Sequence, residues 1–268
     1  MIDAPKWNGE RAVVLGVGVS AIDMDDAVAA IDRWIVNKTP NYVCITGVHG
    51  VMEAQSDPQL RAIHNRAGLV TPDGMPLVWL GRRLGFSRMR RVYGPDLMRT
   101  ITALSPSRRY RHFFYGGAPG VAEELAAKLR RDHPGLDIAG ALCPPFRSLT
   151  PDEDADIVDR INAAAPDIVW VGLSTPKQEY WMASHINRLK APVLIGVGAA
   201  FDFLAGAKRQ APPWMQRNGL EWLFRLVTEP RRLWRRYLRI VPGFIFLIGA
   251  GTLKSWMSNA PTKPAKRA

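Results

Sequence analysis

Short apolar runs alternate with amphipathic stretches along most of the chain. The apolar runs have the length and the β-branched and aromatic content of buried strands, as in Tyr42–Thr46 and Asp167–Leu173. The stretches between them repeat apolar side chains at helical spacing, as in Met24–Trp34. Because such alternation is typical of βαβ units, the pattern predicts an α/β fold with a mostly parallel sheet.

Turn and capping residues delimit the individual elements. We expect a strand or a short hairpin arm at Ala12–Val19. We expect further strands at Tyr42–Thr46, Leu69–Val70, Arg111–Tyr115, Asp137–Ala141, Asp167–Leu173 and Val193–Val197. We expect helices at Met24–Trp34, Gly50–Gln55, Pro58–Asn65, Val121–Arg131, Asp152–Ala164 and Gln178–Leu189. Open parallel sheets bind ligands outside the carboxyl ends of their strands. That rule singles out four loops, which are Thr46–Gly50, Thr71–Gly74, Gly116–Gly120 and Ser174–Gln178.

The segment that follows this alternation is different in kind. Leu220–Val241 is rich in Trp, Leu and Arg, and its stretch RRLWRRYLR places apolar side chains on one side of a helix with arginines around them. The next run, GFIFLIGAG, has nine residues, whereas a membrane-spanning helix needs about 20. The segment therefore suits a helix that lies in the membrane interface. A core helix with a solvated basic face is the alternative.

Positive charge is concentrated in the same region. The 268-residue chain has a formal net charge of +12. Thirteen Lys and Arg face two acidic side chains from Phe203 to Ala268, so the rest of the chain is nearly neutral. Such asymmetry favours an anionic membrane surface or a nucleic acid as partner. The N-terminus has no basic stretch leading into a long apolar one, so we expect no secretory signal and a cytoplasmic location.

Two of the predicted loops carry side chains suited to acid–base or phosphate chemistry. Asp73 lies at the end of a predicted strand, where a carboxylate can act as general base on a hydroxyl group. A turn-forming or capping role explains the same aspartate. Arg91 precedes another predicted helix, where it could bind a phosphate or form a surface ion pair. Gln178, at a helix start beside Lys177, could hold a sugar hydroxyl.

The sequence GGAPG separates a predicted strand from a predicted helix. Gly116, Gly117 and Gly120 would let the backbone approach an anion at the helix N-terminus, although a tight turn needs glycine equally. Another strand ends near Gly198, which is followed by Phe201 and Asp202.

No residue pattern indicates a metal or a cofactor. The five histidines lack the spacing of metal ligands, and no pair of acids at a strand end stands out as a Mg²⁺ or Mn²⁺ site. Asp23, Asp25 and Asp26 cluster at a helix start, where capping and the helix dipole explain them. Cys44 and Cys143 are far apart and have no metal-ligand spacing.

Six segments, in this order, resemble the WecG/TagA/CpsF family of bacterial glycosyltransferases, family 26 of the sequence classification. They are RAGLVTPDGMPLVW, RVYGPDLM, FFYGGAPGVAEELAAKL, DIVWVGLSTPKQEYWM, GVGAAFDFLAG and RQAPPWMQRNGLEWLFRLVTEPRRLWRRYL. The resemblance implies a Rossmann-like body, with helices on both faces of the sheet. It also implies inverting, metal-independent transfer from a UDP-sugar to an undecaprenyl-diphosphate-linked sugar, in surface polysaccharide biosynthesis.

The same resemblance assigns roles to individual residues. It implies that Asp73 is the catalytic base, that Arg91 is an active-site cation and that Gln178 contacts the donor sugar or the acceptor. Thr46 matches the threonine of the family's Thr-x-Asn loop, but Val48 stands at the Asn position, and the neighbouring His49 could supply a polar contact. The donor-binding group comprises Gly116, Gly117, Gly120, Lys177, Gly198, Phe201 and Asp202.

The family's basic C-terminal appendage is held to help membrane targeting and to complete the active site. Here the candidates for contact with lipid diphosphate or membrane are Arg225, Arg231, Arg232, Arg235 and Arg236. We expect a catalytic domain at residues 1–205, a membrane-associating appendage at 206–257 and a disordered tail at 258–268. The expected location is cytoplasmic, peripherally attached to the inner face of the plasma membrane. The resemblance also makes a homo-oligomer plausible.

A nucleic-acid-binding protein is the alternative function. It is supported by an isoelectric point near 10.1 and by the Arg- and Trp-rich tail. Against it, the basic residues interleave with a continuous apolar run, and the sequence has no helix-turn-helix or RNA-binding motif. We therefore expect a UDP-sugar, a polyprenyl-diphosphate-sugar and an anionic membrane surface as partners, and no nucleic acid.

Overall fold

Six parallel strands form the central sheet, in the order β4-β3-β8-β7-β5-β6. The computed structural model describes residues 9–258. The strands of the central sheet are β3 (Asn41–Thr46), β4 (Leu69–Pro72), β5 (Arg111–Gly116), β6 (Asp137–Leu142), β7 (Ile168–Gly172) and β8 (Val193–Gly196). A separate antiparallel hairpin consists of β1 (Arg11–Val14) and β2 (Val17–Ser20). The predicted α/β class and the parallel sheet are confirmed.

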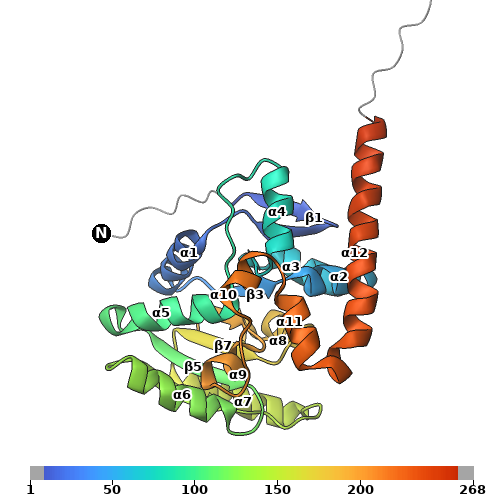
Figure 1. Cartoon of the computed structure of the whole chain (residues 1–268). Helices are drawn as coiled ribbons and strands as arrows, with labels where there is room; N and C mark the ends of the chain where they lie inside the picture. Colours follow the sequence, from blue (N-terminus) through green and yellow to red (C-terminus); the bar gives the residue numbers. More distant parts are fainter. Residues whose placement is uncertain (1–8, 259–268) are drawn as a thin grey trace, which may run out of the picture. The chain divides into compact units, whose positions relative to one another are not determined.

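Helices cover both faces of this sheet (Figure 1). One face packs against α1 (Met24–Asn37), α5 (Gly94–Arg108), α6 (Val121–Asp132) and α9 (Ala200–Ala205). The other face carries α2 (Val48–Ser56), α3 (Pro58–Arg66), α7 (Pro151–Ala164) and α8 (Lys177–His185). The helix α4 (Met75–Arg83) packs against β1 and β4. Burial on both faces explains why the strands read as nearly continuous apolar runs.

Local capping explains where several helices begin. Asp23 accepts a hydrogen bond from the backbone N–H of Asp26, whose side chain accepts one in return from Asp23 N–H, so the acidic run starts α1 with a capping box. Thr150 and Glu153 form the same reciprocal pair at the start of α7. The predicted structural role of the acidic run is thus confirmed for Asp23 and Asp26.

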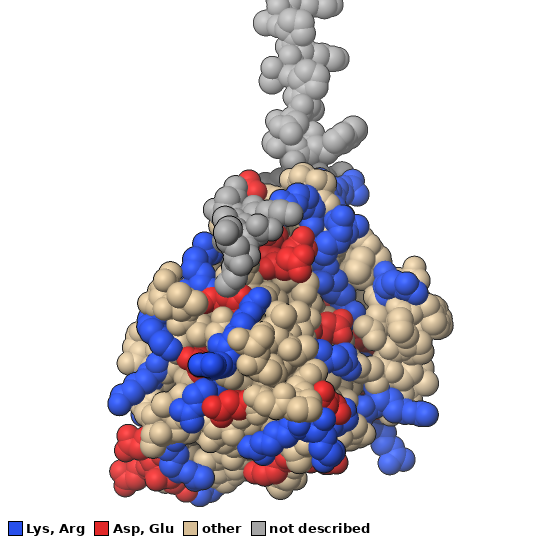
Figure 2. All heavy atoms as spheres, turned by 90° about the vertical axis from the view of Figure 1, so that its left-hand side faces the viewer, with Lys and Arg blue, Asp and Glu red and all other residues tan. Residues whose placement is uncertain are grey.

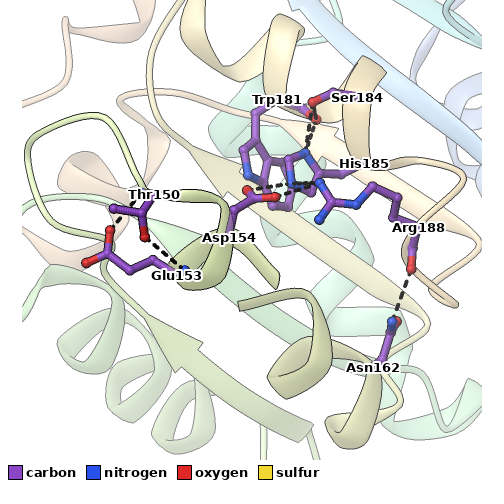
Figure 3. A network of polar contacts seen from close by, with 8 residues as sticks. All are labelled: Thr150, Glu153, Asp154, Asn162, Trp181, Ser184, His185 and Arg188. Carbon is purple, nitrogen blue, oxygen red and sulfur yellow. Dashed lines mark hydrogen bonds and ion pairs between the residues drawn. The ribbon is translucent and has the colours of Figure 1, made fainter. Parts of the chain in front are cut away.

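A polar cluster joins α7 to α8, the helix that begins with Lys177 and Gln178 (Figure 3). The Asp154 carboxylate contacts His185 Nε2 at 2.9 Å and accepts a hydrogen bond from Arg188 Nη1 at 2.6 Å. Trp181 stacks between the rings of His185 and Tyr115, with centroid separations of 4.3 and 4.4 Å. These contacts fix α8 against its neighbours and therefore fix the loop before it.

Two compact units divide between Leu220 and Glu221. The first contains the sheet, its helices and α10 (Pro213–Arg217). The sequence prediction of a catalytic domain at residues 1–205 and an appendage at 206–257 remains a prediction. On the face of the molecule in Figure 2, basic and acidic side chains are interspersed, in keeping with the nearly neutral charge of most of the chain. The tail predicted at 258–268 lies outside the described residues, apart from Ser258.

The second unit consists of α11 (Glu221–Thr228) and α12 (Pro230–Ser258), which pack against each other. Trp222 of α11 and Tyr237 of α12 have ring centroids 5.8 Å apart. The apolar run after the arginines continues α12 through Pro242. Within residues 9–258, no helix is both long enough and apolar enough to cross a membrane.

Candidate active site

Four of the predicted site residues come from the carboxyl ends of adjacent strands. Thr46 ends β3, and Asp73 follows β4, which pairs with β3 on one side. Gly198 follows β8, which pairs with β3 on the other side, and Gln178 packs against the end of β8. The sheet order therefore brings together, at the carboxyl ends of the strands, residues that lie far apart in the sequence.

Backbone contacts on both sides hold Asp73. Its N–H donates to the Thr46 carbonyl at 3.0 Å, and its own carbonyl accepts from Arg91 Nε at 2.5 Å. Asp73 is half-buried, and its carboxyl group faces the loop after β3, because a Cβ atom added at Gly47 would lie 3.6 Å from Asp73 Oδ2. A carboxylate held this way at the carboxyl ends of the strands can accept a proton from a bound hydroxyl group.

Arg91, which the resemblance implies is an active-site cation, lies directly beside this aspartate. Its Nη1 donates to Gln216 Oε1 at 2.9 Å, and its guanidinium carbon lies 3.9 Å from the centroid of the Tyr93 ring. The cation–π contact and the hydrogen bonds hold the guanidinium in a defined position. The segment that includes α10 thus contributes Gln216 to the neighbourhood of Asp73, a contact that the sequence pattern did not indicate.

Gln178 is nearly completely buried at the first turn of α8. Its Nε2 donates to Glu179 Oε1 at 3.1 Å, and Thr175 Oγ1 donates to the same oxygen at 2.9 Å. Burial raises the pKa of the Glu179 carboxyl group, and His64 opposes this rise. Thr46 and His64 are also buried on this side of the sheet, and the Thr46 hydroxyl donates to the Cys44 carbonyl at 3.3 Å.

Sequence reasoning missed the buried Glu179 and His64. A signal for Glu179 was present, because it lies three residues before Met182, on the apolar face of α8. A charged side chain on an apolar helix face indicates a buried group with a specific partner. His64 gave no comparable signal, since its ring is buried only through the packing of α3 against α8.

The glycine loop after β5 needs its glycines for the backbone path. The φ values are +113° for Gly116, +82° for Gly117 and +82° for Gly120. Residues with a side chain rarely adopt such values. A Cβ at Gly116 would lie 2.8 Å from the backbone of Gly172. The tight-turn interpretation is therefore confirmed for these glycines, and Gly120 also stands at the N-terminus of α6, where backbone N–H groups are available.

The remaining donor-binding candidates divide into two groups. Phe201 is buried with its ring edge-to-face on Phe114, and Asp202 forms an ion pair with Lys208 at 2.9 Å, so both have partners within the first unit. Lys177 is closer to the surface, with Nζ 5.3 Å from the centroid of the fully exposed Phe146 ring.

The loop that departs from the family pattern forms the start of α2. Gly47 is the N-cap residue and provides no side-chain cap, and Val48 is the first helical residue. His49 Nε2 lies 3.3 Å from Glu53 Oε1 within the same helix.

The five arginines predicted to face lipid all belong to the second unit. Arg231, Arg235 and Arg236 are exposed, Arg232 forms an ion pair with Glu229 at 2.5 Å, and Arg235 lies 5.2 Å from the centroid of the Trp234 ring. Arg225 lies on α11. In the part of the chain that the structure describes, no group of three or more His, Cys, Asp or Glu side chains is placed to hold a metal ion.

Comparison with known proteins identifies the family of the chain. Residues 12–258 match the sequence model of the glycosyl transferase WecG/TagA/CpsF family. A protein from Bacillus spizizenii, named N-acetylglucosaminyldiphosphoundecaprenol N-acetyl-β-D-mannosaminyltransferase, is 33% identical over 188 residues, which are 70% of this chain and 71% of that protein. A protein of the same name from Staphylococcus aureus is 26% identical over 249 residues, 92% of this chain and 95% of its own length. The chain therefore belongs to the WecG/TagA/CpsF family of glycosyltransferases.

Proposed function

We propose that this glycosyltransferase moves an N-acetylhexosamine from a UDP-sugar onto an undecaprenyl-diphosphate-linked sugar, with Asp73 as general base and with inversion at the anomeric carbon. The names of both relatives support the acceptor class and suggest N-acetylmannosamine as the sugar to test first. The single observation that carries the mechanism is the fixed position of Asp73 at the carboxyl end of β4, between Thr46 and Arg91.

The reaction follows as one displacement. The Asp73 carboxylate removes the proton from the acceptor hydroxyl, whose oxygen attacks the anomeric carbon as the bond to UDP breaks. The new glycosidic bond forms on the face opposite the departing diphosphate, so the configuration inverts. Negative charge develops on the leaving group, where fixed N–H donors and cations would stabilise it. Arg91 and the backbone at the start of α6 are the candidates in the first unit.

The experiment that tests this proposal is transfer from a panel of UDP-sugars to a polyprenyl-diphosphate-N-acetylglucosamine acceptor, with EDTA present. We expect wild type to transfer one sugar and Asp73→Asn to lose roughly 10²–10⁴-fold in turnover, the usual contribution of a general base. Asp137→Asn is the matched control, because Asp137 lies at the start of β6, away from the carboxyl edge. Near-normal turnover of Asp73→Asn would exclude the mechanism, and EDTA-sensitive transfer would exclude metal independence.

We further propose that the second unit attaches the enzyme peripherally to the cytoplasmic face of the membrane, where its lipid-linked acceptor resides. The support is the combination of exposed arginines on α12 with exposed apolar side chains on the same helix. Trp234, Leu238 and Ile245 are 48%, 72% and 66% exposed, and their spacing places them on one side of α12. A helix of this kind binds an anionic bilayer surface through charge and apolar area together.

A further inference from the structure

We propose that Glu179 is a positioning residue that sets the orientation of the Gln178 amide, so that Gln178 Oε1 accepts a hydrogen bond from an N–H or O–H group of a substrate sugar. This inference rests on the proposed function and states what this part of the site requires of its substrate. Glu179 itself acts only through its neighbour, with which it shares the first turn of α8.

The orientation of the Gln178 amide follows from the hydrogen-bond donors that meet at the Glu179 carboxylate. Thr175 Oγ1 and Gln178 Nε2 both donate to Glu179 Oε1, at 2.9 and 3.1 Å. An ionised carboxylate oxygen accepts and does not donate, so the nitrogen of the amide must face it. Glu179 Oε2 has no hydrogen-bond partner among the described residues, so a proton taken up by this group would reside there. Oε1 would remain an acceptor, and the amide would keep its orientation in either protonation state.

Glycines at the end of β8 define where the other half of the amide points. A Cβ atom at Gly196 would lie 3.1 Å from Gln178 Cδ and Nε2, which leaves this amide no room beside a larger residue. A Cβ atom at Gly198 would lie 3.5 Å from Gln178 Oε1. The oxygen is therefore directed towards the loop that follows β8, at the carboxyl edge of the sheet, where Asp73 also lies.

This oxygen lacks a hydrogen-bond donor. Gln178 is 2% exposed, and within residues 9–258 its Oε1 has no hydrogen-bond partner. Buried carbonyl oxygens are paired in most structures, and an unpaired one calls for an explanation. A substrate group that donates to Oε1 would supply the missing bond. If the amide were reversed, it would present N–H groups and repel the same donor.

The chemistry of the substrates identifies which part of them this oxygen recognises. The ionised diphosphates of the donor and the acceptor have only acceptor oxygens, so neither can satisfy Gln178 Oε1. Sugar hydroxyls and the N–H of an acetamido group are donors. We therefore assign the Gln178 oxygen to a sugar and not to a diphosphate. A site built around a buried acceptor discriminates strongly against analogues that lack the matching donor.

Two substitutions at Glu179 separate positioning from structural support. Glu179→Met removes the acceptor and keeps a similar length, whereas Glu179→Gln keeps a carbonyl oxygen that can accept. We expect kcat/KM to fall at least about tenfold in Glu179→Met, as expected when one hydrogen bond is lost, and to stay within about threefold of wild type in Glu179→Gln. Because burying a carboxylate is costly, Glu179→Met should not lower the Tm. Glu124→Met, on the exposed face of α6, is the control for charge removal.

A second readout does not depend on activity. In protein labelled with ¹⁵N-glutamine, the side-chain resonances of Gln178 can be identified by their loss in Gln178→Glu. We expect slow solvent exchange of these N–H groups in wild type and in Glu179→Gln, and fast exchange in Glu179→Met. Unchanged Gln178 exchange, or wild-type kcat/KM, in Glu179→Met would overturn the inference, as would parallel losses of Tm and activity in both Glu179 variants. If wild type transferred no sugar at all, the proposed function would fail, while the amide exchange would still decide the role of Glu179.

Discussion

The ring of His112 is buried on β5 in a single tautomer. Trp170 Nε1 donates to His112 Nδ1 at 3.0 Å, so Nδ1 is unprotonated, and Nε2 carries the hydrogen that faces Ser105 Oγ at 2.8 Å. A second proton would have to enter at Nδ1, against the indole N–H. Burial lowers the pKa of this imidazole from 6.5 to about 4, with a small opposing effect from Asp167.

This depressed pKa makes a prediction about acid stability. As pH falls below 6.5, the unfolded chain binds a proton at His112 before the folded protein does, so stability present above pH 6.5 is lost between 6.5 and 4. The full loss amounts to about 3 kcal/mol. Urea unfolding from pH 4 to 7 should show this loss in wild type. His112→Gln, which has no titrating group, should be less stable at pH 7 but show a flatter pH profile. Identical profiles would contradict the assignment.

Gly116 is predicted to tolerate no side chain. Its φ of +113° is unfavourable for other residues, and an added Cβ would collide with the Gly172 backbone at 2.8 Å. We expect Gly116→Ala to lower the free energy of unfolding by at least about 2 kcal/mol. Gly120→Ala is the matched control, because Gly120 shares a positive φ but has no atom within 4 Å of an added Cβ. Its cost should be about 1 kcal/mol. Equal losses in chemical unfolding would show that contact with Gly172 is unimportant.

Part of the candidate site could be predicted from the sequence, and individual residues show which part. Asp73 is a candidate from sequence because its strand-end position and its motif coincide, and Arg91 because it lies in a second motif. Their catalytic roles stay predictions. The bond from Gln178 to Glu179 was not predictable, because which side chains meet in the interior depends on the packing of α8 against the sheet. Phe201 lies in a motif too, yet its ring serves the core, since motif membership does not distinguish a ligand contact from a support.

Among the elements, α7 depends on the capping box at its start. The Thr150 hydroxyl accepts from Glu153 N–H at 3.2 Å, and the Glu153 carboxylate accepts from Thr150 N–H at 2.9 Å. We expect Thr150→Ala to lower the free energy of unfolding by about 1 kcal/mol, the usual value of an N-cap. Thr150→Ser keeps the hydroxyl and should remain near wild type. Urea unfolding of both variants measures this effect, and a loss in the serine variant as large as in the alanine variant would count against the cap.

Element identities were more predictable than element ends. Every expected strand and helix has a counterpart, because the periodicity reflects burial on one face or two. The segment Ala12–Val19, however, forms two strands of a hairpin, β1 and β2. The helix expected at Gln178–Leu189 ends instead at His185. At this end the His185 ring contacts the Asp154 carboxylate, and the Arg188 backbone N–H donates to the His185 carbonyl in a turn. Such an end depends on a partner in α7, which local sequence does not contain.

At the scale of the whole molecule, the charge asymmetry coincides with the division into two units. The body has a face on which both signs are interspersed, whereas residues 221–258, which form α11, α12 and the residue between them, carry six arginines, one lysine and two glutamates. Length and charge alone could not locate the boundary at Leu220, because α10 resembles the following segment in composition but packs within the first unit. Gln216 shows why this matters, since it accepts a hydrogen bond from Arg91, a candidate active-site residue.

The membrane proposal predicts binding that depends on salt and on lipid charge. Arg231, Arg235 and Arg236 are exposed on α12, and each basic residue near an anionic leaflet contributes about 1 kcal/mol. Replacing all three by Gln should therefore weaken binding to vesicles that contain anionic lipid by roughly 10²-fold. Raising the salt concentration should weaken wild-type binding in the same direction, because the interaction is screened within about 10 Å at 0.1 M.

Vesicle sedimentation with neutral and anionic lipids measures this binding, and duplex DNA in place of vesicles tests the nucleic-acid alternative. Lys128→Gln with Arg130→Gln and Arg131→Gln, on α6 of the body, removes the same charge and serves as control. If the control variant lost as much binding as the α12 variant, net charge and not α12 would govern attachment. If wild type sedimented with DNA but not with anionic vesicles, the basic helices would have to be reassigned to a nucleic acid, and the glycosyltransferase would need another route to its lipid-linked acceptor.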